Sequence, residues 1–381
     1  MHHLPYWRLS GFYFSYFAFT GVFSPYWSLY LKSLSFSAFQ IGVLMSLLPI
    51  MRTFASAVWG TFADRSGKRM KIVRWSALLS LVSFAGVFAG NGFWWLFLAM
   101  ALMSFFWSAS LPLVEAATMS HLGEHIAGYG RIRLWGSVGF VVAVVGVGYV
   151  LDRVEVTVLL WVVLASKIGI AYFCRQIPEA ATAAHHTDHQ PVWHILRKPE
   201  VAFFLFACFL MAAAHGPYYT FFSIYLVDHG YAKSTVGWLW ALGVICEIAI
   251  FIWLPRILHY VSLRRILIFS LGCTALRFLL IGWGVDAWPL ILIAQALHAV
   301  TFGAYHAAAM AVVHHFFRGR HQTKGQAIYG SLSFGAGGMT GALLSGYLWD
   351  SVGAAWVFSA CSVAALAGML LLWWKLKLEP E

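Results

Sequence analysis

Stretches of apolar residues long enough to form membrane helices follow one another along the whole chain, separated by short polar connections. An α-helix of about 20 apolar residues can cross the hydrocarbon core of a bilayer. The pattern predicts an all-α integral membrane protein, with no polar stretch long enough to form a soluble domain. We place twelve transmembrane helices at residues 9–31, 39–62, 71–90, 93–120, 131–151, 156–174, 200–226, 235–257, 265–284, 288–316, 325–348 and 352–374.

The chain also aligns with itself at a shift of 195 positions. Ser-Leu-Tyr-Leu at 28–31 falls on Ser-Ile-Tyr-Leu at 223–226, and Arg52 falls on Glu247. With small slips the match continues in two later pairs of segments, Glu115–Met119 with His306–Met310 and Gly148–Val154 with Gly346–Val352. A duplicated half-chain in so apolar a sequence indicates a transporter in which one repeat rocks against the other.

The repeat predicts a division into two six-helix bundles, 1–175 and 200–381. An axis along the membrane normal should relate them, because the shift covers an even number of helices and so preserves orientation. The polar residues 176–199 between the bundles are typical of a flexible cytoplasmic linker. The linker holds four histidines, but no cysteine or well-placed carboxylate completes a metal site, so we expect no metal. These histidines are His185, His186, His189 and His194.

The composition excludes other classes of protein. The chain is 61% hydrophobic and 10% charged, whereas soluble domains are about a quarter charged, and its mean hydropathy is +0.76. Nineteen lysines and arginines lie on the side of the membrane that holds both termini, and only Lys32, Arg153 and Lys233 lie in the opposite loops. The positive-inside rule places the richer side, and both termini, in the cytoplasm. The net charge of +11 therefore reports topology, and we expect membrane lipid but no nucleic acid as a partner.

Few charged residues lie inside the predicted spans. A charge near the centre of a bilayer costs about 2.5 to 3.5 kcal/mol on insertion scales, so it usually faces a cavity or a partner. Glu115 and Glu247 are the carboxylates well inside the spans, and a buried carboxylate or a histidine can bind and release a proton as access alternates. The alternative is that such residues form ion pairs that only hold helices together. We expect proton coupling from Glu247, Arg277, His298, His306 and Glu115. Lys167 is expected to snorkel towards a cytoplasmic span end.

Residues 60–69 read Gly-Thr-Phe-Ala-Asp-Arg-Ser-Gly-Lys-Arg, directly after the second predicted span. Gly67 permits a tight turn, and Asp64 can pair with cations or a helix N-terminus to latch one conformation. The segment resembles the loop signature G-x-x-x-D-R-x-G-[RK]-[RK] of the major facilitator superfamily. This resemblance implies the fold of that superfamily, twelve transmembrane helices in two six-helix bundles. It also implies a gating role for Gly60, Asp64, Arg65, Gly67, Lys68 and Arg69.

Residues 129–137 resemble the start of span five in the lactose-permease-like branch of this superfamily. Glu115 precedes Arg133 by 18 residues, which is the separation of the sugar-binding Glu–Arg pair in that branch. Two antiparallel helices could bring these two side chains face to face, either to bind substrate or as a permanent brace.

The coupling region of the same branch is only partly matched. Arg277 and His298 agree with it. Thr301, however, stands where the branch has a proton-carrying carboxylate, and Val244 aligns with its span-eight glutamate, with Glu247 three residues on. The resemblance therefore implies proton-coupled transport with rearranged coupling residues.

Over nearly its whole length the chain is similar to the bacterial 3-phenylpropionic acid transporter group, in residues 23–32, 215–219, 236–243 and 298–310. The resemblance implies a monomeric transporter of the bacterial inner membrane, not an enzyme. It would import a small organic solute, an aromatic carboxylate such as 3-phenylpropionate, with the proton gradient as energy source and no cofactor. Arginines can pair with a carboxylate, and aromatic side chains offer ring faces. The expected substrate contacts are Glu115, Arg133, Arg131, Arg52, Trp135, Tyr26, Trp27, His215, Tyr218 and Tyr219.

Three other functions stay open at this point. The first is proton-coupled symport of a sugar, an oligosaccharide or a nucleoside. The second is drug–proton efflux, although the glycine-proline motif typical of span five in that class is not seen. The third is a sensor that binds a ligand without moving it.

Overall fold

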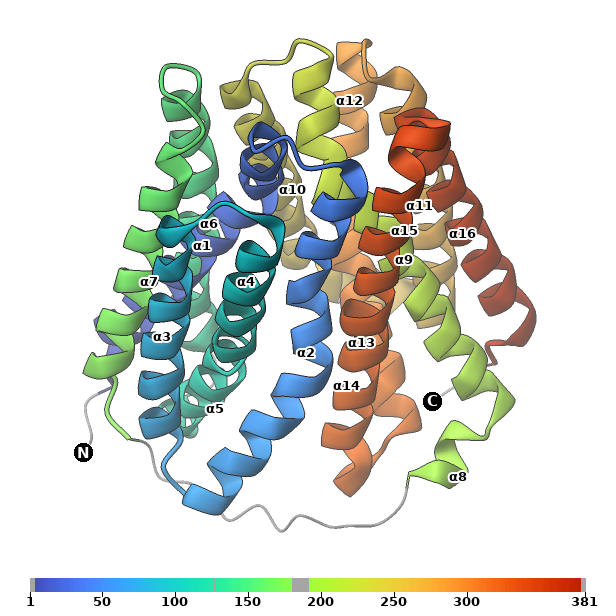
Figure 1. Cartoon of the computed structure of the whole chain (residues 1–381). Helices are drawn as coiled ribbons and strands as arrows, with labels where there is room; N and C mark the ends of the chain where they lie inside the picture. Colours follow the sequence, from blue (N-terminus) through green and yellow to red (C-terminus); the bar gives the residue numbers. More distant parts are fainter. Residues whose placement is uncertain (1–3, 126–127, 180–191, 378–381) are drawn as a thin grey trace. The chain divides into compact units, whose positions relative to one another are not determined.

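The computed structural model describes residues 4–125, 128–179 and 192–377, and every element in these residues is helical (Figure 1). The α-helices are α1 (Tyr6–Ser33), α2 (Ala38–Ser66), α3 (Arg69–Ala85), α4 (Phe93–Trp107), α5 (Ser110–Leu122), α6 (Tyr129–Leu151), α7 (Val158–Gln176), α8 (Trp193–Leu196), α9 (Pro199–Asp228), α10 (Lys233–Tyr260), α11 (Leu263–Gly284), α12 (Trp288–Ala296), α13 (Tyr305–Phe316), α14 (Gln322–Gly330), α15 (Gly338–Val352) and α16 (Ala354–Lys375). The all-α fold predicted from the sequence is confirmed.

Ten helical segments in the described residues have the length and the apolar composition that a membrane span needs. They coincide with ten of the twelve predicted spans, and the other two, 9–31 and 325–348, are helical as well. Two predicted spans contain a π-helical segment, η3 (Ala299–Ala304) and η5 (Ser331–Gly337). Short π segments inside α-helices are frequent at functional sites, because they change the direction of the side chains around them.

The helices form two compact units, which are described separately. Unit 1 comprises residues 1–186 and 232–238, which include the start of α10, and unit 2 comprises residues 187–231 and 239–381. Part of the predicted linker 176–199, with His185, His186 and His189, lies outside the described residues, and His194 lies in the short helix α8.

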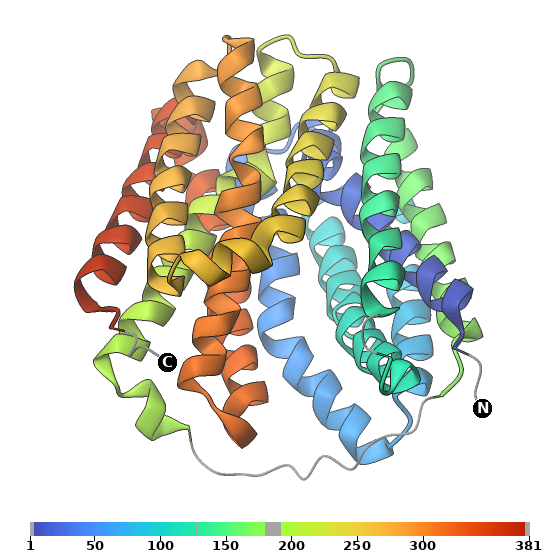
Figure 2. The ribbon, with the colours of Figure 1, turned by 180° about the vertical axis from the view of Figure 1, so that it is seen from behind.

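In unit 1, α1 packs along α6 and α7, and both ribbon views show α1 (dark blue) against α6 (Figures 1 and 2). Glycines make this approach possible. A Cβ added to Gly139 of α6 would lie 2.3 Å from the Phe14 carbonyl oxygen, and one added to Gly21 of α1 would lie 2.7 Å from the Phe140 carbonyl oxygen. Close backbone approach at small residues is how membrane helices gain packing energy, since lipid removes the drive to exclude water.

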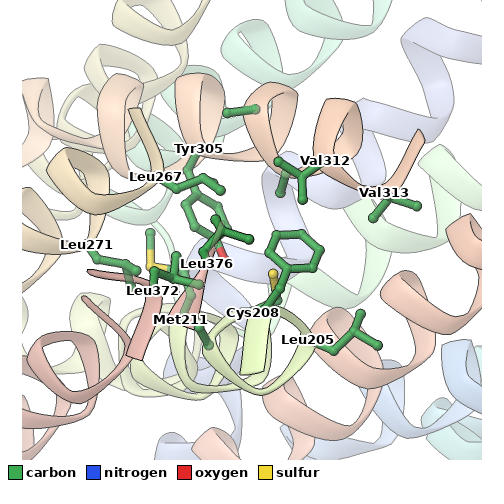
Figure 3. Close-up of a cluster of buried hydrophobic side chains, with 14 of the residues drawn as sticks. Leu205, Cys208, Met211, Leu267, Leu271, Tyr305, Val312, Val313, Leu372 and Leu376 are labelled. Carbon is green, nitrogen blue, oxygen red and sulfur yellow. The ribbon is translucent and has the colours of Figure 1, made fainter. Parts of the chain in front are cut away.

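Unit 2 packs α9 against α15 and α16 in the corresponding way. A Cβ on Gly341 of α15 would lie 2.2 Å from the Ala213 carbonyl oxygen of α9. Its apolar core joins α9, α11, α13 and α16, and Figure 3 shows Leu205 and Cys208 of α9 together with Val312 of α13 in this core. The core is closely packed and apolar, so the polar groups of unit 2 described next stand out from it.

Candidate functional site

Arg277 of α11 is fully buried in unit 2. Its Nε donates to the Ala294 carbonyl oxygen at 2.9 Å, and its Nη1 donates to Thr301 Oγ1 at 3.3 Å. The guanidinium also lies over the Tyr218 ring, 4.2 Å from the centroid. Thr301, which replaces the carboxylate of the lactose-permease-like branch, thus supplies a neutral acceptor to this cation. Among the described residues Nη2 has no hydrogen-bond partner.

Two buried side chains complete the surroundings of Arg277. His215 Nδ1 lies 2.8 Å from the Met211 carbonyl oxygen, so Nδ1 donates and Nε2 is left to accept from Arg277 Nη1 at 3.4 Å. Tyr218 donates to Gln295 Oε1 at 3.0 Å. Sequence reasoning missed Gln295, although a lone amide inside a predicted span was a signal for it. The network keeps His215 neutral beside the arginine, because a second proton would remove its acceptor.

Glu247 of α10 and His298, which precedes the π segment η3, face each other in unit 2. Glu247 Oε2 lies 4.0 Å from His298 Nε2, and the side chains are 17% and 8% exposed. Two glycines leave room for this pair. A Cβ on Gly243 would lie 3.2 Å from the His298 ring, and one on Gly303, inside η3, would lie 3.0 Å from Glu247 Cγ. The local helix geometry thus places a carboxylate and an imidazole together inside an apolar unit.

His306 lies farther along the same column of rings. Phe302 separates it from His298, with ring centroids 5.3 Å from His298 and 6.3 Å from His306. His306 Nδ1 lies 3.2 Å from the Tyr329 hydroxyl. The two predicted histidines share one side of the helix, but the phenyl ring between them prevents a direct proton transfer.

In unit 1 the predicted pair Glu115 and Arg133 is not formed. Tyr129 donates to Glu115 Oε1 at 3.3 Å, whereas Arg133 lies over the Phe17 ring, 3.9 Å from the centroid. Among the described residues no ion pair within 4.0 Å joins the two. The reason is that Tyr129, at the start of α6, occupies the space beside the carboxylate, while Arg133, one turn later, turns towards α1.

Arg52 of α2 is exposed and lies over the buried Trp107 ring, 5.4 Å from the centroid. Trp107 is stacked on Tyr16, with centroids 4.7 Å apart. Arg52 and Arg133 therefore each lie beside an aromatic ring, on whose face a guanidinium can stack. Sequence reasoning named both arginines but missed the rings, Trp107 and Phe17, that hold them.

Tyr26 and Trp27, which were expected to offer ring faces to a substrate, are fully buried in unit 1. Tyr26 donates to the Val144 carbonyl oxygen at 2.7 Å, and Trp27 Nε1 lies 3.3 Å from the Met100 sulfur. Their polar atoms are satisfied within the unit. In this structure both side chains pack inside the unit, and their contact with substrate stays a prediction.

Three further predicted residues lie near the ends of helices or at the edge of the Arg277 network. Trp135 Nε1 donates to the Tyr6 hydroxyl at 3.1 Å, and Arg131 is exposed in the first turn of α6. Tyr219 is half-buried, with its ring centroid 6.4 Å from that of His215. Only Tyr219 of these three lies beside a polar cluster.

The predicted gating segment 60–69 covers the end of α2, a turn and the start of α3. Gly67 has φ +61° and ends α2, as expected for a residue that must adopt the left-handed conformation. Arg65 and Lys68 are exposed, and Arg69 is buried. The side chain of Asp64 lies outside the described residues, so its latch role stays a prediction.

Lys167 differs from expectation. It is the middle residue of α7 and is 1% exposed, so it does not snorkel. Its Nζ donates to Ser80 Oγ at 2.9 Å. The prediction was wrong because it placed Lys167 near the end of the span, whereas the side chain lies at mid-helix and faces α3 and α1.

Among the described residues no cluster of three His, Cys, Asp or Glu side chains could hold a metal ion.

A comparison with protein families matches residues 6–360 to the family described as "MFS_1 like family". The chain belongs to this family. It is 29% identical to the "Probable 3-phenylpropionic acid transporter" of Escherichia coli K12, over 94% of this chain and 95% of that protein. It is 26% identical to the maltose permease of Geobacillus stearothermophilus, over 95% and 93%.

The fold is likewise that of solved transporters in this superfamily. The structure of the nucleoside transporter NupG matches with a TM-score of 0.87 at 16% identity, covering 98% of this chain and 99% of that one. The human organic anion transporter MFSD10 matches with a TM-score of 0.66 at 17% identity, covering 97% and 99%. The chain is therefore a multi-pass membrane transporter with the major facilitator fold and not an enzyme, as the sequence predicted.

Proposed function

We propose that this transporter is a proton symporter that imports a small aromatic carboxylate such as 3-phenylpropionate. The observation that carries the proposal is the approach of Glu247 and His298, with 4.0 Å between Oε2 and Nε2 in an apolar unit. Binding of one proton by a carboxylate and an imidazole at this distance changes the net charge of the pair. The pair can therefore bind and release a proton as water reaches it.

The buried cation Arg277 makes the energy of unit 2 depend on whether this proton is bound. It is a fully buried cation, and its hydrogen bonds go to the neutral acceptors Ala294, Thr301 and His215. Its positive charge disfavours a second positive charge on His298, which stacks on the same Tyr218 ring, so we expect the Glu247–His298 pair to carry its charge as a negative Glu247. A proton on Glu247 removes that negative charge, so the electrostatic energy of unit 2 differs between the protonated and the deprotonated state. Such a change is what coupling requires.

The support for an anionic, aromatic substrate comes from unit 1. Arg52 and Arg133 lie beside the rings of Trp107 and Phe17, at 5.4 and 3.9 Å from the centroids. A guanidinium held against a ring keeps its fork-shaped edge in one orientation for a carboxylate. A protein that is 29% identical to this chain is named as a probable transporter of 3-phenylpropionic acid, which is an aromatic carboxylic acid.

The test is uptake by purified protein in proteoliposomes, with an imposed proton gradient and labelled 3-phenylpropionate. We expect accumulation above the external concentration that disappears when a protonophore removes the gradient. The neutral analogue 3-phenylpropionamide serves as the matched control, because it keeps the ring and loses the charge. Accumulation of the amide to the same level would exclude recognition of the carboxylate.

Symport of a sugar or a nucleoside is the second candidate. Glu115 and the Tyr129 hydroxyl that donates to it at 3.3 Å form a polar pair suited to substrate hydroxyl groups, and similar proteins include a maltose permease and a putative nucleoside transporter. Labelled maltose and uridine in the same proteoliposomes distinguish this candidate. Binding of a ligand without accumulation would indicate a sensor, and proton-driven extrusion from loaded vesicles would indicate efflux.

A further inference from the structure

Lys167 has one oxygen partner and two aromatic neighbours. Its Nζ donates to Ser80 Oγ at 2.9 Å, and Ser80 in turn donates to the Met103 carbonyl oxygen at 3.0 Å. Nζ also lies 3.9 Å from the Phe19 ring centroid and 5.5 Å from that of Trp107. With 1% of its surface exposed, the amine is enclosed within unit 1.

In the part of the chain that the structure describes, no acidic side chain balances this amine. The helix α7 packs against α1 and α3, and neither these three helices nor α4, which supplies Trp107, contains an aspartate or a glutamate. Among the described residues no carboxylate lies within 4.0 Å of Lys167. Besides Lys167, the charged side chains on these four helices are all cations. They are Arg8, Lys32, Arg69, Lys71, Arg74 and Arg175. The α1 residues Gly11, Ser15 and Phe19, which lie against Phe173, Gly169 and Lys167 of α7, carry no acidic or basic group.

A permanent ammonium at this place is therefore poorly supported. Removing an ion from water without a counter-ion is costly, and one hydrogen bond with two ring faces offsets only part of that penalty. A neutral amine fits the surroundings better, because it still donates one N–H to Ser80 and leaves its lone pair against apolar groups.

Packing does not require a lysine here, as the repeat shows. At the 198-residue shift that aligns Gly148 with Gly346, the five buried residues of α7 fall on buried residues of α16. The pairs are Leu159 and Val357, Val163 and Cys361, Lys167 and Ala365, Ile170 and Gly368, and Cys174 and Leu372. Ala365 is fully buried in the apolar core of unit 2. The corresponding helix of unit 2 is thus packed with an alanine where unit 1 has the lysine.

We propose that Lys167 is a second proton-binding site of the transport cycle, located in unit 1 and separate from the Glu247–His298 pair. The proposal rests on the proposed function, proton-driven transport. In the conformation described here the amine is neutral. When water or an anionic solute reaches it, its lone pair takes a proton from solvent to form the ammonium, and the same proton returns to solvent when the amine is enclosed again.

The first experiment measures the charge state without any substrate. The melting temperature of the purified protein is followed between pH 6 and 9 for wild type and for Lys167→Met. A neutral buried amine must gain a proton on unfolding, so wild type should become more stable relative to Lys167→Met as the pH rises. Lys71→Met, on the neighbouring helix α3 and exposed, is the matched control and should follow wild type.

Two results overturn the proposal at this stage. Parallel curves for wild type and Lys167→Met mean that the amine carries the same charge in the folded and unfolded states. Failure of both Lys167→Met and Lys167→Ala to fold means that the lysine is needed for packing, against the comparison with Ala365. Neither result depends on which solute is transported.

The second experiment asks whether this proton belongs to the cycle. Proton-driven accumulation of 3-phenylpropionate in proteoliposomes is measured against external pH for wild type, Lys167→Met and Lys167→Arg. We expect a lower accumulation ratio and a displaced pH profile in both variants, with exchange of internal for external solute retained. An unchanged ratio and profile in Lys167→Met would overturn the proposal, whereas absence of uptake by wild type would instead count against the substrate proposed above.

Discussion

Glu247 and His298 occupy a place where a single proton has a large electrostatic effect. They lie 4.0 Å apart in an apolar unit that also holds the buried Arg277. The effective dielectric constant there is well below that of water, so removal of one charge changes the energy of all its neighbours. Residues of this kind can be tested by substitutions that keep their shape.

Replacing Glu247 by glutamine should abolish uphill accumulation of substrate while leaving exchange intact. The amide keeps the size and the hydrogen-bonding capacity of a protonated carboxyl but cannot release a proton. The measurement is accumulation and counterflow in the same proteoliposomes. If Glu247→Gln accumulates substrate against a gradient as wild type does, Glu247 is structural.

Replacing Arg133 by lysine separates two roles of that residue. Lysine keeps the charge but loses the planar fork that lies 3.9 Å from the Phe17 centroid. Loss of one charge-assisted hydrogen bond, about 1.5–3 kcal/mol, corresponds to a dissociation constant at least about tenfold higher. Isothermal calorimetry with 3-phenylpropionate measures it, and Arg153→Lys, exposed just after the end of α6, is the control. Wild-type affinity in Arg133→Lys would remove Arg133 from the site.

At the scale of helices, glycines decide how closely neighbours pack. A Cβ at Gly341 would lie 2.2 Å from the Ala213 carbonyl oxygen, whereas one at Gly330, in the same predicted span, would meet nothing within 4 Å. Gly341→Ala should therefore destabilise the protein by about 1–3 kcal/mol or more, the range for overpacked sites, and Gly330→Ala should not. Melting temperatures in detergent test this, and equal losses in the two variants would contradict it.

The start of α10 is held by a carboxylate from the end of α6. Asp152 Oδ1 accepts from the Lys233 amide at 2.8 Å, and Oδ2 accepts from the Ser234 amide at 3.2 Å, which satisfies N–H groups that a helix start leaves open. Burial tends to raise the pKa of Asp152, but the hydrogen bonds from Ser234 and Lys233 outweigh it, and the net effect lowers that pKa. The contact is therefore complete above the usual carboxyl pKa of about 4 and is lost only as the pH falls through the lowered value.

Asp152→Asn should weaken this contact at neutral pH. We expect faster hydrogen exchange in the peptide that covers Lys233 and Ser234, and the same increase at pH 6 and pH 8 after correction for intrinsic exchange, because the wild-type carboxylate is ionised at both. Asp286→Asn, an exposed carboxylate in another loop, is the control. Unchanged exchange in Asp152→Asn would show that the first turn of α10 is stable without the carboxylate.

Helix positions were predictable from apolar periodicity, but the interior geometry was not. The pattern located Glu247, His298 and Arg277 on their helices, since a charge in an apolar run is visible in the sequence. It could not show that Phe302 separates the two histidines, or that Arg133 turns to Phe17 rather than Glu115. Those outcomes depend on side-chain rotations and on π segments, which leave no periodic signal. Lys167 was misjudged for the same reason, because depth along a helix was estimated without knowing which face packs.

At the scale of the whole molecule, the duplicated sequence predicts the membrane topology. A parallel repeat requires equivalent loops of the two halves to lie on the same side of the membrane, whereas an inverted repeat would place them on opposite sides. The excess of lysine and arginine in alternate loops makes the same assignment independently, because it uses charge and not similarity. The repeat predicts that both termini lie on one side of the membrane, and the positive-inside rule predicts that this side is the cytoplasm.

Cysteine labelling tests this assignment at three exposed positions, Lys68, Arg153 and Asp286. A membrane-impermeant maleimide should label Arg153→Cys and Asp286→Cys in intact cells, and should label Lys68→Cys only after permeabilisation. Cys246→Ser is a suitable parent, since Cys246 is half-buried and the other four native cysteines are buried. Labelling of Arg153→Cys and Asp286→Cys from opposite sides would exclude a parallel repeat, and labelling of Lys68→Cys in intact cells would invert the assigned orientation.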